Sequence, residues 1–356
     1  AGFGNIPLKT DDLNISPKLG IYGILDQVTL SSQKSKNVIE SVRHYGTFLS
    51  SYLPNLSSKQ EALGHMSVTS GMVPNPLMIQ ETFVNNLNGS SATSRNFRGN
   101  SFCINLPTGF LMSKESINLS GRGGGVGGLD LAPDSQVLNG SWTNAFYQLT
   151  DVNLVCEVIN PSVDELSRMM SKTSATMEYN AISSYYQTIA SSNAIINFRL
   201  GLSRVLGAYM TFIPSAYLNN LTYDGYQTTP LINDLATSEI APIKQVIFTR
   251  GGERMPLMYN LDANVRDDAS STISDPQIVR NYMNSFKSFM TNIKTQQSPV
   301  TNNRIGFSDQ TAFADAGLMF GVGVAFDNIS GEGVDFRNEA FGVQMETGLT
   351  KDLPHS

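Results

Sequence analysis

The stretch that decides the predicted fold is Tyr147-Gln-Leu-Thr-Asp-Val-Asn-Leu-Val-Cys-Glu-Val-Ile159, followed closely by Pro161-Ser-Val-Asp-Glu165. From Val152 onward the apolar residues of the first segment alternate with their neighbours, which predicts one long strand with a buried face. Ser162 and Glu165 form an S-x-x-E capping box, in which each side chain satisfies a free backbone N–H. A helix is therefore expected to begin directly after the strand.

Working outward, short strand signals dominate the chain. Ile21–Leu30 is rich in branched and apolar residues, and Ser101–Leu106 runs into the turn signal Pro107-Thr-Gly109. A second helix is predicted from Asn37 to Pro54, and a third from Asp275-Pro276. Their apolar stripes are Val38, Ile39, Val42, Tyr45, Phe48 and Leu49 in the second helix, and Ile278, Val279, Tyr282, Met283, Phe286, Phe289 and Met290 in the third. We read both stripes as core and predict an all-β fold with a few short helices in loops.

The organisation of the chain suggests a weak duplication. Each half has an amphipathic helix, several short strands and a Gly-rich crossover, and the capped helix lies between the halves. We predict one domain over residues 1–160, a linker helix over 161–172 and a second domain over 173–356. We also expect both ends to be cut back from a longer polypeptide. Long loops are predicted at Gly121–Gly128, Tyr217–Asn233 and Asp262–Ser274.

Composition excludes several classes of protein. Hydrophobic residues make up 40% of the chain and charged residues 15%, and no apolar run reaches the length of a membrane-spanning helix. The formal net charge is −6, with 24 basic and 30 acidic side chains and no run of Lys or Arg. Because phosphate binding requires a basic stripe, we expect no direct nucleic-acid binding.

No group of residues in the sequence has the pattern of a known catalytic site. Gly123–Gly128 satisfies G-x-G-x-x-G, but the strand-like Leu129-Asp-Leu-Ala-Pro133 follows it where a phosphate site needs a helix, so we predict a flexible loop. The histidines, His44, His65 and His355, belong to no ligand-spaced set, and no G-x-S-x-G nucleophile elbow occurs. We place His44 on the helix that starts at Asn37, as an exposed residue. We predict a protein that is not an enzyme, with no catalytic, cofactor-binding or metal-binding residues and no cofactor.

The acidic groups and the cysteines also have ordinary interpretations. The tight acidic groups, Asp267-Asp268 and Glu332 with Asp335, lie in loops and are read as solvated turns or surface contacts. Asp327–Glu332 approximates a calcium loop only loosely. Cys103 and Cys156 lie in apolar strand-like contexts, where buried free thiols are favoured over a disulfide.

Taken in order, several segments resemble those of the double jelly-roll major capsid proteins of tailless icosahedral viruses. This lineage includes adenovirus-type viruses, virophages, polinton-like viruses and membrane-containing tailless phages. Each segment alone is degenerate, so the resemblance depends on their order. In the first half they are Lys36–Tyr45, Phe102–Leu111 and Tyr147–Glu157; in the second, Ile196–Leu206 before a strand Ala208–Ile213, Gln245–Pro256, Phe320–Phe326, Gly331–Asp335 and Phe341–Met345.

The resemblance implies two tandem eight-stranded antiparallel jelly rolls, and the chain length accommodates two such units. It implies a homotrimer that forms a pseudo-hexameric capsomer and tiles an icosahedral virion shell, assembled inside the host cell. The implied partners are further copies of the chain in neighbouring capsomers, penton proteins and minor capsid proteins. Whether a membrane lies beneath the shell stays open.

Two other functions stay open at this point. One is a two-domain β-sandwich adhesin or lectin, and the other is a secreted β-sandwich glycosidase with paired acids. A lectin would be expected to show an aromatic platform or a calcium loop, and Trp142 is the single tryptophan of the chain.

Overall fold

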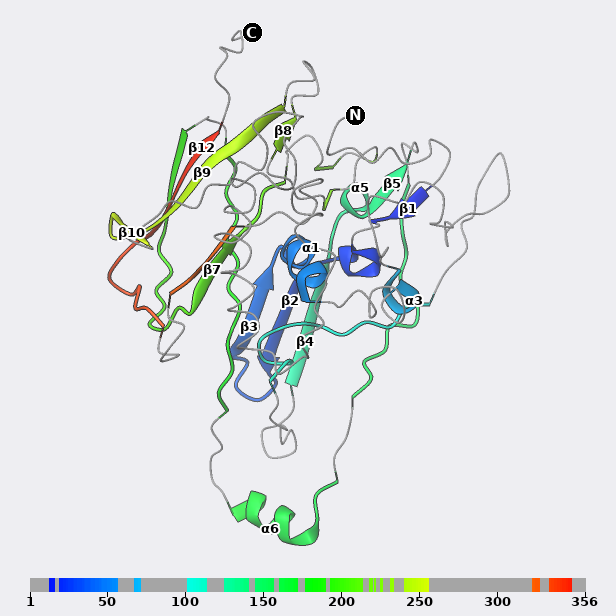
Figure 1. Cartoon of the computed structure of the whole chain (residues 1–356). Coiled ribbons are helices and arrows are strands. Elements are labelled where there is room, and N and C mark those ends of the chain that lie inside the picture. Colours follow the sequence, from blue (N-terminus) through cyan, green and yellow to red (C-terminus); the bar gives the residue numbers. More distant parts are fainter. Residues whose placement is uncertain are drawn as a thin grey trace, which may run out of the picture.

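The computed structural model describes a defined part of the chain (Figure 1). The described residues are 13–16, 19–56, 67–71, 101–113, 125–140, 145–156, 160–171, 177–189, 193–213, 218–219, 221, 225–226, 231–233, 240–255, 322–326 and 333–347.

Antiparallel strands make up most of the regular structure in these residues, and the helices are few and short. The strands are β1 (Leu13–Ile15), β2 (Leu25–Ser32), β3 (Val38–Arg43), β4 (Gly125–Leu131), β5 (Leu138–Gly140), β6 (Asn193–Phe198), β7 (Gly207–Met210), β8 (Leu231–Asn233), β9 (Ile240–Arg250), β10 (Glu253–Met255), β11 (Val322–Ala325) and β12 (Phe341–Thr347). The helices are the 3₁₀ helix η1 (Gly20–Ile24), α1 (Tyr45–Leu56), α3 (Ser67–Ser70), α5 (Asp134–Val137) and α6 (Val163–Ser171). This confirms the prediction of an all-β chain with short helices.

The strands before α6 pair in a nested order. The first described strand, β1, pairs with β5, and inside that pair β2 pairs with β4. Strand β3 lies on the other side of β2, so the larger sheet has the order β3-β2-β4. In its register Val28 faces Val42 on one side and Leu129 on the other.

The strands after α6 repeat the nested order. Here β6 pairs with β12, and inside that pair β7 pairs with β11. The larger sheet has the order β10-β9-β12-β6, with β8 also paired to β9, and β11-β7 forms a second, smaller sheet. Strands β9 and β10 form the hairpin that the Gln245–Pro256 motif predicts. Gly251 and Gly252 at its turn have φ of 55° and 95°, in the left-handed region that two-residue hairpins require.

Each of these groups of strands has its own buried apolar cluster. The first cluster consists of Ile15, Leu19, Ile21, Tyr22, Ile24, Leu25, Val28, Val42, Tyr45, Leu49, Leu53, Ala132, Val137, Leu138 and Tyr226. The second consists of Val205, Val246, Phe248, Phe336, Phe341, Val343 and Met345, with Ala208 and Met210 of β7 packed against it. Because the second cluster draws on both the large and the small sheet, it fills a two-layer sandwich.

The helix predicted from Asn37 was wrong over its first part. Residues Val38–Arg43 form β3, a bend at His44 follows, and α1 begins only at Tyr45. The pattern misled because Val42 of the strand and Tyr45 and Leu49 of the helix are all buried in the same cluster. Pro54 does not stop α1, which ends at Leu56.

Two of the predicted strands are not strands over the residues described. Segments 101–106 and 147–156 have no ladder partner among the described strands. Alternate residues of 101–106 and of 145–150 do pack against the first cluster, among them Phe102, Ile104, Tyr147 and Leu149. From Asp151 to Cys156 every residue is exposed, so the predicted buried face is wrong there; residues 157–159 lie outside the described part.

Other predictions had mixed outcomes. Gly125–Gly128 of the predicted flexible loop belong to β4, so that loop was wrong for these residues. The strand predicted at Ile21–Leu30 is confirmed from Leu25, after the buried turn of η1. The helix predicted at Asp275-Pro276 and the loop Asp262–Ser274 lie outside the described residues.

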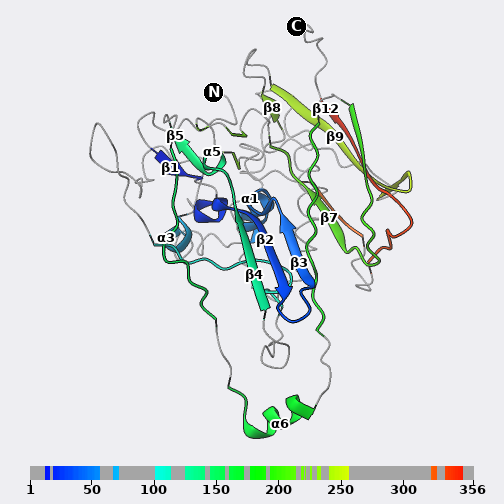
Figure 2. The ribbon, with the colours of Figure 1, turned by 180° about the vertical axis from the view of Figure 1, so that it is seen from behind.

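The capping box at α6 is confirmed. The backbone N–H of Glu165 donates to Ser162 Oγ at 3.3 Å, and the backbone N–H and hydroxyl of Ser162 both contact Glu165 Oε2, at 3.3 and 3.2 Å. Helix α6 lies well apart from the β3-β2-β4 sheet and from the β10-β9-β12-β6 sheet in Figure 1 and in the reverse view of Figure 2.

A tyrosine from beyond α6 completes the first cluster. Tyr226 is fully buried, and its hydroxyl donates to the carbonyl of Gly23 at 2.5 Å. Its ring packs so closely on Gly46 of α1 that a Cβ at Gly46 would lie 2.6 Å from Tyr226 Cε1. Glycine is therefore required at position 46 by the close approach of the ring.

We predict that Gly46→Ala destabilises the protein by about 1–3 kcal/mol, the usual cost of overpacking a close-packed core. The measurement is urea unfolding followed by circular dichroism. In a Tyr226→Leu background the same substitution should cost much less, since the ring that it meets is gone. Equal costs in the two backgrounds would contradict the close contact.

Candidate functional site

The sequence predicted no site residues, and of the side chains weighed there, His44 and Asp335 have local structural partners. His44 lies in the bend between β3 and α1 with φ of 51°, and not in a helix as predicted. Its Nδ1 is 3.8 Å from Asp26 Oδ1, and its ring is 5.0 Å from the ring of Tyr186. His65 and His355 lie outside the described residues. Among the residues that are described, no group of three or more His, Cys, Asp or Glu side chains could hold a metal ion.

The prediction of buried cysteines was wrong. Cys103 and Cys156 are both free and both exposed. Cys103 alternates with Phe102 and Ile104, which pack against the first cluster, and therefore points the other way. Cys156 ends the exposed segment that begins at Asp151.

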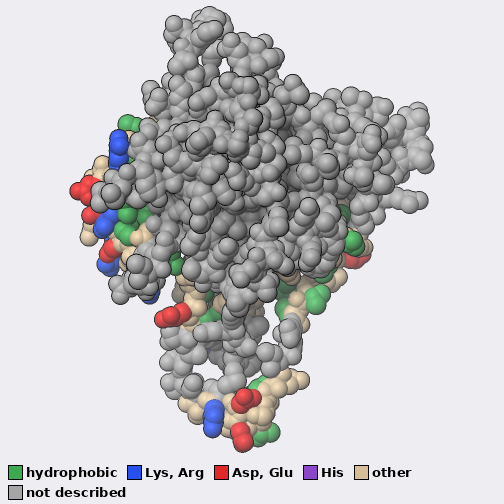
Figure 3. Space-filling model, viewed as in Figure 1, with side chains coloured by type: hydrophobic (Ala, Val, Ile, Leu, Met, Phe, Trp, Pro, Cys, Tyr) green, Lys and Arg blue, Asp and Glu red, His purple; other side chains and the backbone are tan. Residues whose placement is uncertain are grey.

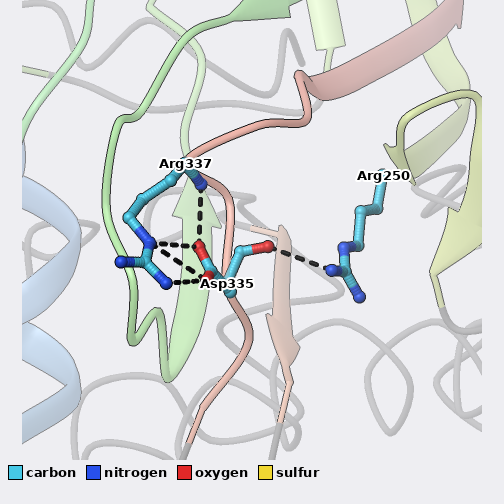
Figure 4. Close-up of polar contacts among 3 residues, drawn as sticks. All are labelled: Arg250, Asp335 and Arg337. Carbon is cyan, nitrogen blue, oxygen red and sulfur yellow. Dashed lines mark hydrogen bonds and ion pairs between the residues drawn. The ribbon is translucent and has the colours of Figure 1, made fainter.

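Asp335, one of the predicted acidic residues, forms a compact ion pair with Arg337 (Figure 4). Arg337 Nε donates to both carboxylate oxygens at 3.1 and 3.0 Å, and the Arg337 backbone N–H donates to Oδ1 at 2.9 Å. These hydrogen bonds lower the pKa of Asp335 to about 2. Asp267, Asp268, Glu332 and the loose calcium loop Asp327–Glu332 lie outside the described residues.

Arg250 fastens the same turn onto the larger sheet of the second group. Its Nη2 donates to the carbonyl of Asp335 at 3.1 Å, its Nε pairs with Glu339, and its guanidinium lies 5.8 Å from the centre of the Phe336 ring. The turn between the Val205–Val334 bridge and β12 is thus held by two ion pairs, Asp335–Arg337 and Arg250–Glu339, and by the buried ring of Phe336. We assign this group a structural role.

A buried carboxylate that sequence reasoning missed ties three distant segments together. Glu40 of β3 is 4% exposed, and its carboxylate accepts hydrogen bonds from three backbone N–H groups. Gly109 donates to Oε1 at 3.0 Å, Phe110 to Oε2 at 2.8 Å and Ile182 to Oε1 at 2.8 Å. The available signal was the period-two spacing of Glu40 and Val42, which share a face of β3.

Segment 177–189 lies along the outer edge of β3 through further bonds. The Tyr179 hydroxyl donates to the carbonyl of Ile39 at 2.9 Å, and the Ser184 hydroxyl donates to that of Arg43 at 2.5 Å. Burial and the charge of Glu40 raise the pKa of Tyr179. The edge of β3 is therefore covered by the chain that returns from α6.

Residues 151–156 and helix α6 project away from the sheets (Figure 1). We call the described residues 151–156 and 160–171, including α6, the arm. On the outgoing side Tyr147 anchors it, with its hydroxyl bonded to the carbonyl of Ala132 at 2.6 Å. Val152, Leu154 and Val155 are 69%, 80% and 87% exposed. Figure 3 shows hydrophobic, acidic and basic side chains of the arm at the lower tip of the molecule.

The comparisons with known proteins supply no name for these features. No model of a known protein family matches the chain, and no curated protein matches it either. No helix among the described residues is both long and apolar enough to cross a membrane. The surface that we consider further is the arm, which exposes the uncharged residues 152–156 and is anchored at its two roots by partly buried hydrogen bonds.

We predict that Glu40→Gln destabilises the protein by about 2 kcal/mol or more, since hydrogen bonds to a charged group contribute roughly 1.5–3 kcal/mol. A glutamine also presents an amide donor to a site that holds only backbone donors. Urea unfolding measures the effect. The control is Glu253→Gln on exposed β10, which should change stability by less than about 0.5 kcal/mol. Equal effects of the two variants would contradict the role of Glu40.

We also predict a stability change with pH from the Asp335–Arg337 pair. The pKa of Asp335 falls from 3.8 to about 2 in the folded chain. Its contribution is therefore complete above the unfolded pKa and is lost as the pH falls through the folded value. The unfolding free energy of the wild type relative to Asp335→Asn should be constant above about pH 5 and should shrink toward pH 2. Arg337→Gln should raise the Asp335 pKa in an NMR titration, while Arg199→Gln leaves it unchanged.

Proposed function

We propose that this chain is a structural protein, the major capsid protein of a double jelly-roll lineage, and that three copies form one pseudo-hexameric capsomer. In this proposal the sheets stand roughly perpendicular to the shell and the loops at one end form the outer surface. Neighbouring capsomers, penton proteins and minor capsid proteins meet the trimer at its sides. The genome is not contacted directly.

The observation that carries the proposal is the nested pairing, which occurs once on each side of α6. A jelly roll follows from an antiparallel hairpin that rolls up, so that its first strand lies beside its last and its second beside the one before. The pairs β1–β5 and β2–β4 have this order, and so do β6–β12 and β7–β11. Two tandem jelly rolls account for both sets.

The buried clusters support the same organisation and add rigidity to it. Each set of nested strands has its own cluster, as two tandem units require. Ile182, Tyr209, Leu221 and Tyr226, which all follow α6 in the sequence, nevertheless pack in or against the first cluster. A tile in a closed shell must keep its shape, and this contribution of residues after α6 to the first cluster joins the two units.

The surface of the described residues suits self-assembly. Large apolar side chains are exposed on the arm and on β4, while charged residues make up only 15% of the chain. Obligate interfaces between copies are more apolar than ordinary protein surface and commonly bury roughly 2,000 Å² or more. The exposed apolar residues therefore favour a subunit of an assembly over a monomeric binding module.

We predict that the purified protein is a trimer by light scattering, and that it stays a trimer in about 1 M NaCl, where the Debye length is near 3 Å. Apolar contacts persist in salt, whereas exposed ion pairs contribute about 0–1 kcal/mol and fade. Dissociation in high salt would contradict an apolar interface. A stable monomer at micromolar concentration would contradict the capsid proposal, and a monomer that binds glycans would favour the lectin.

A further inference from the structure

No described residue of the chain covers the arm. Both of its ends are fixed, by Tyr147 on the outgoing side and by the Glu40–Ile182 bond on the return. Between these anchors, residues 151–156 are exposed without exception, and α6 exposes Val163 and Leu166. Residues 152–156 carry no charge, whereas a projection in water is normally polar. An exposed run without charge, such as residues 152–156, has the composition of an interface core.

Strand β4 is a matching surface on the same chain. It is an edge strand in the order β3-β2-β4, and all seven of its residues are exposed. Val126, Leu129 and Leu131 are more than two-fifths exposed, and Asp130 is its single charged residue. Natural edge strands are usually protected by Lys, Pro or a bulge that blocks pairing. Strand β4 has no Lys or Pro, and the irregularity in its ladder, between Leu25 and Gln27, lies in β2. Such an edge accepts an extended segment from another chain.

We propose that residues 151–156 of one copy add to the β4 edge of a second copy as an antiparallel strand. Residues 151–156 run toward α6, whereas β4 starts at the end of its sheet that faces α6 in Figures 1 and 2. Copies related by rotation about an axis along the strands therefore present the two segments antiparallel. The contact is head-to-tail, and such contacts close into rings when the rotation allows. This inference rests on the self-assembly proposed above.

Charge supports the same direction of pairing. The Gly125 end of β4 lies beside the β2–β3 turn, since Gly125 pairs with Ser32. That turn carries Lys34 and Lys36, both exposed, and the first turn of α6 carries Asp164 and Glu165. With residues 151–156 antiparallel to β4, α6 lies beyond the Gly125 end and its acidic first turn meets the two lysines of the second copy. A parallel arrangement would separate these charges.

The native Cys156 allows a direct test by cross-linking. In the antiparallel pairing Cys156 lies near the Gly125 end of the partner strand, so Val126→Cys places a second thiol beside it. We make Val126→Cys in a Cys103→Ser background and oxidise the full-length protein gently. We expect dimers and larger covalent species on non-reducing gels, at a yield at least about tenfold above the control, because disulfides form only at Cα separations below roughly 7 Å.

The matched control is Val38→Cys in the same background. Val38 is 60% exposed and Val126 is 48% exposed, and they lie on opposite edge strands of one sheet. Cys103→Ser alone measures any cross-link between two Cys156 residues. Equal yields for Val126→Cys and Val38→Cys, or products of monomer size only, would overturn the inference.

A second pair of variants needs no cross-link. Val155→Asn should weaken self-association by about tenfold or more, since it removes an apolar side chain from the interface. Val68→Asn on α3 is the matched control, because Val68 is 78% exposed and lies off the arm. If the wild type is a monomer, the proposed function fails. If it is a trimer and both variants behave like it, only the arm inference fails.

Discussion

The structure depends on the buried carboxylate of Glu40, which has no cationic partner among the residues that the structure describes. Burying an ionised group is costly unless hydrogen bonds replace its water, and the Glu40 carboxylate receives three, all from backbone N–H groups. Two of the donors lie 69 and 70 residues along the chain and the third lies 142 residues along it. A single side chain thus fixes the position of β3, of the turn at Gly109 and of the segment that returns from the arm. The covered edge of β3 and the fixed root of the arm are both consequences of it.

Features set by neighbouring residues could be predicted from the sequence. The capping box at Ser162 and Glu165 and the two-glycine hairpin between β9 and β10 are examples, because each depends on residues within a few positions of one another. Glu40 and Tyr226 could not be found in this way, since their partners lie far along the chain. The prediction of a helix from Asn37 was wrong for a related reason. Apolar residues of a strand and of the following helix face one core, so a strand, a bend and a helix together mimic a single helical stripe.

The segment Tyr147–Ile159 shows a different limit of prediction from periodicity. Periodicity describes which side chains share a face of an extended segment, but it does not say what covers that face. In the first part of the segment, before the predicted alternation begins at Val152, Tyr147 and Leu149 pack against the chain's own core. From Val152 to Cys156 the residues are exposed on both sides. No described residue of the chain covers this apolar pattern, and under the proposed assembly contacts with another copy would cover it.

Buried contacts within the chain join its two halves closely, whereas the described residues of the arm project from both halves. Tyr226 and segment 177–189 hold the second half against the first through buried hydrogen bonds and ring packing on glycine. These contacts lie inside one chain and persist whether or not other copies are present. Among the described residues, the hydrogen bonds that join the arm to the rest of the chain lie near its roots, at Tyr147 and Ile182. Under the proposed assembly these two parts would have separate tasks. The internally bonded body would set the shape of the subunit, and the arm would follow the arrangement of the neighbouring copies.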